Sequence, residues 1–165
     1  MGSDSDYPTM KPACEIFDQL FISYEILVAS AHRSPERTRM YIRNAKKKGI
    51  RVVVAGAGAA AHLPGVLAAE TVLPVIGVPI DSSPLNGLDS LLAICQMPGG
   101  IPVATMAIGK AGAKNAGLLA AQILALSDSK LSAKLQKHRN KMAKEVEAKD
   151  KNLQAEHGKN YKNSK

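Results

Sequence analysis

Residues 51–65 read RVVVAGAGAAAHLPG. An apolar run at residues 52–55 is followed by glycine and alanine at residues 56–61 and then by HLPG. The run at residues 51–55 is β-branched and does not alternate with polar residues, which predicts a strand buried on both faces. A short helix is predicted at residues 62–71, and it must end before Pro74. A strand, a tight loop and a helix in this order form one unit of an α/β fold.

The same unit recurs on both sides of this stretch. Further strands are predicted at residues 24–29, 74–80 and 101–107, and helices at residues 9–20, 34–48, 88–96 and 111–126. Because the strands are apolar throughout, they predict a parallel sheet covered by helices on both faces. The first predicted element is a helix, whereas a sheet of this type should open with a strand. Either a strand precedes residue 1 or the sheet is one strand short at its edge.

The composition of the chain changes near residue 126. Residues 1–126 contain all nine prolines and twelve of the thirteen glycines, whereas residues 127–165 hold 11 Lys and Arg against 5 Asp and Glu. We expect an α/β catalytic domain at 1–126, a helical arm at 127–157 laid across a neighbouring subunit, and a disordered tail at 158–165. A solvated, partly frayed helix is the alternative for the arm. The helix is predicted from side chains that recur at spacings of three and four and form one narrow stripe: Leu131, Leu135, His138, Met142 and Val146.

Composition also restricts the function. The chain has only two cysteines and no secretory signal, so we expect a protein of a reducing compartment, the cytoplasm. Glycine and proline interrupt the longest apolar stretch, so no membrane span is expected. Aromatic residues are only 4% of the chain, and most of the net charge of +8 lies in the tail, which argues against nucleic acid as a partner. Only five residues between 52 and 126 are charged, so the helices there need cover from other subunits and a homo-oligomer is expected.

The first of three polar loops is GSDSD at residues 2–6, directly before the first predicted helix. The free N–H groups at a helix N-terminus favour an anion, so a phosphate could bind beside Ser3, and Asp6 could reach a ribose hydroxyl. The alternative is that these side chains only cap the helix.

The second polar loop is SAHRSP at residues 30–35, directly after the strand predicted at 24–29. Arg33 has the forked geometry that binds phosphate, and His32 carries an imidazole, a group that can give and take protons in catalysis. The alternative is a surface arginine beside an ordinary loop histidine.

The third polar loop is GAGAAAHLPG at residues 56–65. It matches the dinucleotide-binding pattern G-x-G-x-x-A, and Asp81 lies at the end of the next strand. However, the helix that follows is short and contains Pro64 and Gly65. The alternative is a tight loop that lets the backbone approach a small ligand closely, with His62 either contacting the ligand or satisfied within the loop.

All three loops are expected at the same edge of the sheet, because ligands of open α/β sheets bind at the carboxyl ends of the strands. A shared small-molecule site explains three such loops better than three separate capping or surface roles. The four histidines and two cysteines offer no metal-binding set, so no metal is expected.

Several long motifs in one order now resemble a known family, the class I PurE family, which is 5-(carboxyamino)imidazole ribonucleotide mutase of purine biosynthesis. The resemblance runs from Gly2 to about Leu126. The motifs that carry it are GSDSD, SAHRSPERT, AGAGAAAHLPG, LPVIGVP, LNGLDSLLAICQMPGGIPVATMAIG and AGAKNAGLLAAQILAL. Ala59 stands where the family usually has a second glycine.

The resemblance implies a flavodoxin-like three-layer α/β/α sandwich, a homo-octamer and no metal or organic cofactor. It also implies an isomerase that moves a carboxylate of a ribonucleotide substrate from the exocyclic nitrogen to carbon 4 of the imidazole. It places His32 as the general acid and base, and Ser3, Asp6 and Arg33 on the substrate. It places the pocket lining at Ser5, Ser30, Gly58, His62 and Leu63.

Two other functions remain open at this point. One is the sister activity, an aminoimidazole ribonucleotide carboxylase that uses carbon dioxide directly, although that type resembles SAHKGP at the second loop, where this chain has SAHRSP. The other is a non-catalytic phosphate- or nucleotide-binding module that uses the basic tail.

Overall fold

A computed structural model describes residues 1–157 and builds them around three parallel strands: β1 (Val53–Gly58), β2 (Val75–Ile80) and β3 (Ala104–Thr105). The strand order is β1-β2-β3, and the register pairs Val53 with Val75 and Ile76 with Ala104. All six residues of the central strand β2 are buried, which explains why its sequence is apolar without alternation.

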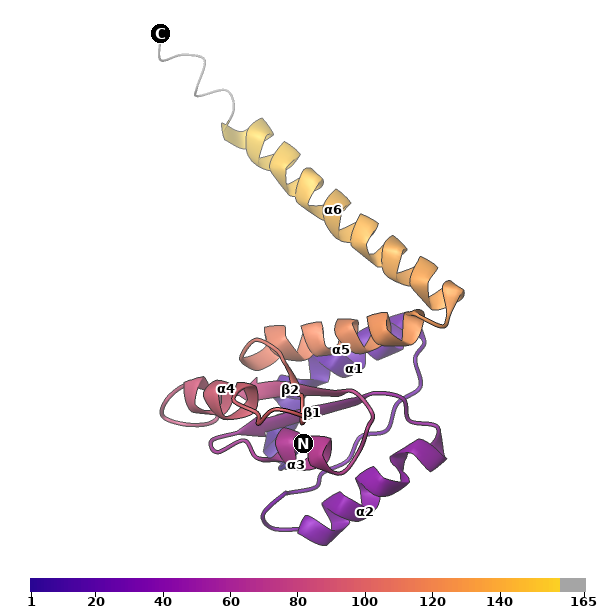
Figure 1. Cartoon of the computed structure of the whole chain (residues 1–165). Coiled ribbons are helices and arrows are strands. Elements are labelled where there is room, and N and C mark those ends of the chain that lie inside the picture. Colours follow the sequence, from indigo (N-terminus) through magenta and orange to yellow (C-terminus); the bar gives the residue numbers. More distant parts are fainter. Residues whose placement is uncertain (158–165) are drawn as a thin grey trace.

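Helices cover both faces of this sheet (Figure 1). The helices α1 (Tyr7–Leu20) and α5 (Gly109–Ala125) lie on one face. The other face carries α2 (Pro35–Ala45), α3 (Leu63–Ala69) and α4 (Leu88–Cys95). Two short 3-10 turns, Asp4–Asp6 and Lys46–Lys48, precede α1 and follow α2. The predicted three-layer α/β/α fold is confirmed. No helix in residues 1–157 is both long and apolar enough to cross a lipid bilayer.

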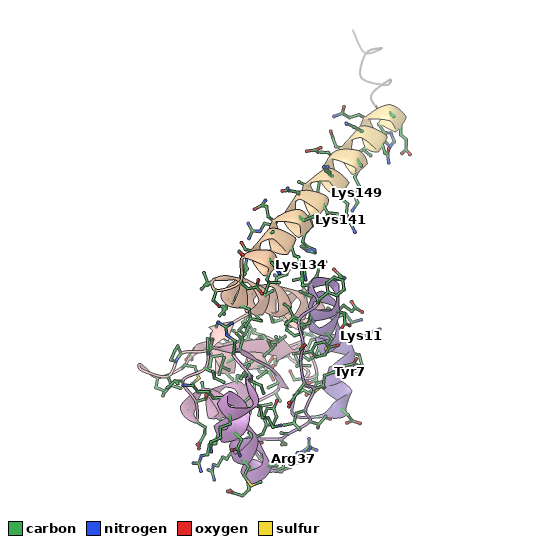
Figure 2. All side chains as sticks on the ribbon, turned by 90° about the vertical axis from the view of Figure 1, so that its right-hand side faces the viewer. Tyr7, Lys11, Arg37, Lys134, Lys141 and Lys149 are labelled. Carbon is green, nitrogen blue, oxygen red and sulfur yellow. The ribbon has the colours of Figure 1, made fainter. Side chains whose placement is uncertain are left out.

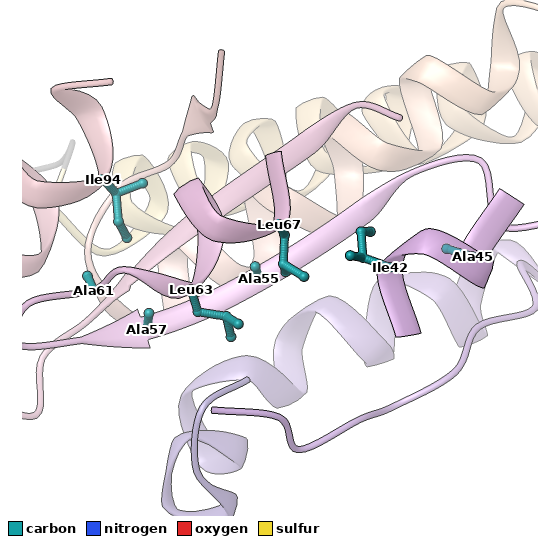
Figure 3. Packing of buried hydrophobic residues seen from close by; sticks show 8 residues of the cluster. All are labelled: Ile42, Ala45, Ala55, Ala57, Ala61, Leu63, Leu67 and Ile94. Atoms are coloured by element: carbon teal, nitrogen blue, oxygen red, sulfur yellow. The ribbon is translucent and has the colours of Figure 1, made fainter. Parts of the chain in front are cut away.

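The two faces of the sheet hold separate parts of the core, because side chains alternate along each strand. On the α3 side, Ala55 and Ala57 of β1 pack with residues of α2, α3 and α4 (Figure 3). On the α1 side, Ile76 and Val78 pack against both covering helices. Those helices approach closely: a Cβ at Gly117 of α5 would lie 3.0 Å from the carbonyl oxygen of Ala13 in α1.

The predicted strand at residues 24–29 is wrong, because the segment has no strand partner in the described part of the chain. Its backbone is nevertheless extended, since consecutive side chains turn to opposite helices. Tyr24 donates to Asp18 of α1, whereas Glu25 accepts a hydrogen bond from Tyr41 of α2. An apolar run predicts burial, but a strand also needs a neighbour at hydrogen-bonding distance. The strand predicted at 101–107 is likewise reduced to the two residues of β3.

The last helix, α6 (Ser129–His157), projects away from the α/β body (Figure 1). Leu131 is buried against α1 and α5, and the Lys134 ammonium donates to the carbonyl of Leu20 at 3.0 Å. Side chains leave the remaining turns in all directions (Figure 2). The predicted long C-terminal helix is confirmed, but the disorder predicted for 158–165 lies outside the described residues.

Candidate active site

The first polar loop folds onto itself before α1. The backbone N–H of Ser5 and its hydroxyl both donate to Oγ of Ser3, at 3.3 and 2.8 Å. The backbone N–H of Ser3 donates to Oδ2 of Asp6 at 3.1 Å, and Asp6 is buried. Ser3 and Asp6 therefore form a capping box before α1, and the side chain of Ser5 is left exposed.

The second polar loop is held by Ser30, whose carbonyl accepts from the backbone N–H of Ser34 at 3.0 Å and from the hydroxyl of Thr38 at 3.3 Å. The Ser30 hydroxyl accepts from the backbone N–H of Arg33 at 3.1 Å. Arg33 then reaches across to the first loop, where its Nη2 donates to the carbonyl of Gly2 at 3.1 Å. This bond uses only one of the five N–H groups of the guanidinium.

The third polar loop begins where β1 ends at Gly58. A Cβ at Gly58 would collide with Oγ of Ser82, so the loops after β1 and β2 meet closely at this glycine. Ala59 and Ala61 adopt positive φ angles of 53° and 46°, which are strained for residues with a Cβ. These turns bring His62 to the N-cap of α3.

His62 meets His32 from the second loop. The Nδ1 of His62 lies 2.6 Å from the Nε2 of His32, and the two rings are tilted by 75°. One ring must donate and the other must accept, so the pair shares one proton between these two nitrogens. Both rings are exposed, so a ligand at the rim can reach them.

Eight of the nine residues predicted for the site lie in these three loops. The ninth, Leu63, is the first residue of α3. The Leu63 side chain packs in the core beside Ile42 and Leu67, so only its backbone at the start of α3 faces the loops. A cavity of about 480 Å³ elsewhere in the α/β body is lined by none of His32, Arg33 or His62. Because these three side chains are exposed, the candidate site is an open rim of loops in this single chain.

Other reactive groups do not join this rim. Burial raises the pKa of the Cys14 thiol, and the nearby carboxylate of Asp18 raises it further, so this thiol is a poor nucleophile. Within residues 1–157, no three His, Cys, Asp or Glu side chains are grouped closely enough to hold a metal ion.

The sequence pattern missed the contribution of the loop after β2. Ser82 contacts the end of β1, and the carboxylate of Asp81 lies 3.7 Å from the position of a Cβ on Gly109, at the start of α5. The sequence had singled out only Asp81 from this loop, as part of a dinucleotide-binding pattern. Its position directly after a buried strand was the available signal, because neighbouring parallel strands end at one edge.

The whole set of elements matches a known family. The family model described as AIR carboxylase matches residues 1–145. The chain belongs to the AIR carboxylase family. A similar protein of Bacillus subtilis, named N5-carboxyaminoimidazole ribonucleotide mutase, is 61% identical over 139 residues, which cover 84% of this chain and 86% of the relative. A protein of the same name from Thermotoga maritima is 53% identical over 165 residues, 100% of this chain and 95% of the relative.

A solved structure agrees with this membership in the AIR carboxylase family. The crystal structure of Treponema denticola PurE matches with a TM-score of 0.82 at 25% identity, and the match covers 93% of this chain and 94% of that chain. The predicted resemblance to the PurE family is confirmed.

Proposed function

We propose that this chain is an N5-carboxyaminoimidazole ribonucleotide mutase that acts in purine biosynthesis. The observation that carries the proposal is the contact of His32 with His62 at 2.6 Å, beside an arginine that ties the first two loops together. The geometry offers one proton-transfer group and one phosphate-binding group at the carboxyl edge of a parallel sheet. Relatives at 53–61% identity that carry this name support the same reaction.

The substrate phosphate binds between Arg33 and the first loop. The guanidinium contacts the carbonyl of Gly2, so a phosphate beside it also lies next to the hydroxyls of Ser3 and Ser5. Oδ2 of Asp6 is bound to the backbone of Ser3, and Oδ1 is the acceptor that we assign to a ribose hydroxyl. The imidazole of the substrate then extends towards Gly58, where the missing side chain allows close approach.

His32 moves the protons of the reaction. It gives a proton to the exocyclic nitrogen, the bond from this nitrogen to the carboxylate carbon breaks, and carbon dioxide is released with the bond electrons left on the aminoimidazole. Carbon 4 attacks the trapped carbon dioxide and forms the new carbon–carbon bond. Carbon 4 then loses its proton to His32, which restores the starting protonation state, so no external acid, base or oxidant is consumed. The product is 4-carboxy-5-aminoimidazole ribonucleotide.

His62 and the small loop around it serve this transfer. The contact links the two nitrogens of neutral His32: if Nε2 donates to His62, Nδ1 is left as the acceptor, and if Nε2 accepts, Nδ1 carries the hydrogen. The loop between Gly58 and His62 is made of alanine, which suits a site that holds carbon dioxide and excludes water. We assign neither a metal nor an organic cofactor to this reaction.

We further propose that the enzyme is a cytoplasmic homo-octamer, with the catalytic domain at 1–126 and an arm at 127–157. Two observations support the assembly. The site is an open rim in one chain, and apolar side chains remain exposed on α4, including Leu88 and Leu92. Neither nucleic acid nor a membrane is proposed as a partner.

The deciding experiment is an assay of the purified chain with N5-carboxyaminoimidazole ribonucleotide and no added bicarbonate. We expect formation of the 4-carboxy product. A parallel reaction with aminoimidazole ribonucleotide and carbon dioxide distinguishes the sister carboxylase. Efficient product formation in that reaction alone would identify a carboxylase instead, and binding without turnover in either reaction would identify a non-catalytic nucleotide-binding module.

A further inference from the structure

The contact between His32 and His62 also has the chemistry of a metal-binding pair. Nε2 of His32 and Nδ1 of His62 face each other at 2.6 Å, and both side chains are exposed. Each of these nitrogens carries a lone pair in one tautomer of its neutral ring, and neutral imidazole is the commonest metal ligand in proteins. The two histidines therefore present two nitrogen ligands to one point that solvent reaches. We call them the histidine pair.

The backbone on both sides of the histidine pair is hydrogen-bonded. The carbonyl of Ser30 accepts from the backbone N–H of Ser34 at 3.0 Å, which closes the second loop around His32. The carbonyl of His62 accepts from the backbone N–H of Val66 at 3.0 Å, at the start of α3. Only the side-chain torsions of the two rings remain to be fixed when an ion binds, so the cost of ordering the ligands is small.

The distance between the two nitrogens is close to the distance that one ion requires. A tetrahedral ion with metal–nitrogen distances of about 2.0–2.1 Å holds two nitrogens about 3.3 Å apart. The two nitrogens must therefore separate by about 0.7 Å from their present 2.6 Å, which rotation of two exposed rings provides. The hydrogen between them moves to the other nitrogen of its own ring. Both facing nitrogens then become ligands, and two neutral rings release no net proton.

The ligand set selects the class of ion. Imidazole suits copper, nickel and zinc, whereas magnesium and calcium prefer oxygen ligands. Within residues 1–157, no third His, Cys, Asp or Glu is placed to complete a metal centre around the histidine pair. An ion on two imidazoles keeps open positions that water fills, so it binds reversibly and is not a resident cofactor.

We propose that His32 and His62 together bind one divalent transition-metal ion (copper, nickel or zinc) and that this ion inhibits the enzyme. The ligand atoms are Nε2 of His32 and Nδ1 of His62. The ion takes one of the two nitrogens of the proton-transfer group, and it places its charge and its water ligands at the rim where the substrate binds. The binding does not depend on the reaction assigned above, whereas the inhibition rests on the proposed mutase function.

Binding is tested by calorimetric titration of the tag-free chain with Ni²⁺, and Mg²⁺ is the control ion. The four histidines of the chain supply matched variants. His32→Asn and His62→Gln each remove one proposed ligand, and the double variant His138→Asn with His157→Asn removes both histidines of α6. All chains carry Cys95→Ser, because an exposed thiol also binds transition metals.

We expect the parent to bind one Ni²⁺ ion and the α6 double variant to bind it with the same affinity. Either rim variant should bind Ni²⁺ at least about tenfold more weakly, because even the loss of a neighbour of a metal ligand typically weakens binding by that factor. Mg²⁺ should not bind. Equal affinity in the parent and both rim variants would overturn the proposal, since the ion would then be adventitious. A loss with only one rim variant would also overturn it, since the two rings would not act as a pair.

A second measurement needs no substitution at the rim. Ni²⁺ is paramagnetic and broadens the NMR signals of nuclei close to it. In a chain with ¹⁵N-labelled histidine, substoichiometric Ni²⁺ should broaden the imidazole signals of His32 and His62 and leave those of His138 and His157 sharp. Broadening of the α6 histidines alone would overturn the proposal, even if a rim variant failed to fold.

The inhibition is measured separately, in the mutase assay. Ni²⁺ at concentrations that fill the histidine pair should lower turnover by about 10²-fold, the usual contribution of a general acid–base group, and a chelator should restore it. Full turnover with the pair filled would overturn the inhibition. A chain that binds Ni²⁺ at the pair but never turns over would refute the proposed mutase activity and leave the metal site in place, so the two failures are distinguishable.

Discussion

The α/β body and the helix α6 both carry apolar side chains at regular spacing, but α6 buries only the first of its apolar side chains. In the body, residues from distant elements meet around β2, as Ile76 and Val78 show. In α6, Leu131 is buried, whereas Met142 is 39% exposed and Val146 is 66% exposed. The comparison teaches that a local sequence pattern is sufficient to predict a helix, but it does not show which surface buries the apolar face of that helix. We therefore place chemistry in the body and assembly in the arm, and four experiments test this division.

The largest effect is expected from His32→Asn in the body. Asparagine keeps a polar side chain but cannot carry a proton between the substrate nitrogen and carbon 4. Steady-state assays should show turnover reduced by about 10²–10⁴-fold, with substrate binding and melting temperature near those of the parent. His157→Asn in the arm is the matched control and should keep full turnover. A loss of less than about tenfold for His32→Asn would remove the proton-transfer role.

The arm should control assembly instead. Truncation after Leu126 is expected to reduce the size or stability of the oligomer, measured by light scattering, while any remaining octamer still turns over. The double variant Met142→Glu with Val146→Glu tests the exposed stripe alone, because it leaves Leu131 in place. Glutamates at Asn140 and Ala148 add the same charge on the opposite side of α6 and should leave assembly intact. A stable octamer after truncation would contradict the arm proposal.

A smaller effect is expected from Arg33→Lys. Lysine keeps the charge, but it cannot bind one phosphate oxygen while holding the carbonyl of Gly2 with the same rigid fork. We expect KM to rise about tenfold, equivalent to about 1.4 kcal/mol, with a smaller change in kcat. Arg139→Lys in the arm is the control. An unchanged KM would place the phosphate elsewhere on the rim.

The sequence predicted the body to the extent that local signals fix it. Pro35 at the start of α2 and Gly49 with φ of 81° after the basic 3-10 turn mark a helix whose ends are encoded locally. The convergence of the polar loops was also predictable, because parallel strands end at one edge. The contact between His32 and His62 has no local signal: it depends on how two loops thirty residues apart fold back.

Non-local pairing explains the errors as well. Residues 24–29 have the composition of a strand, but pairing requires a neighbour that no property of those six residues can supply. The resemblance placed Leu63 in the pocket lining, and its side chain packs into the core beside Ile42, so its predicted role can fall only to its backbone. Likewise, the sequence of α6 does not show which surface would cover its apolar side chains.

The smallest effect concerns strain in the third loop, where the body differs from the regular helix of the arm. Ala59 has a φ of 53°, and a left-handed conformation costs a residue with a Cβ roughly 1–2 kcal/mol. Glycine removes this cost but gives the unfolded chain more freedom, so Ala59→Gly should stabilise the fold by about 0.5–1 kcal/mol. For a chain of this size that corresponds to a melting temperature about 1–4 °C higher. Ala60→Gly is the matched control, because the neighbouring residue does not adopt a positive φ and glycine there brings only the entropic cost. The two variants should therefore shift the melting temperature in opposite directions. If Ala59→Gly instead destabilises the chain as much as Ala60→Gly does, the loop holds its shape without strain at Ala59, and the close approach at Gly58 alone accounts for its small residues.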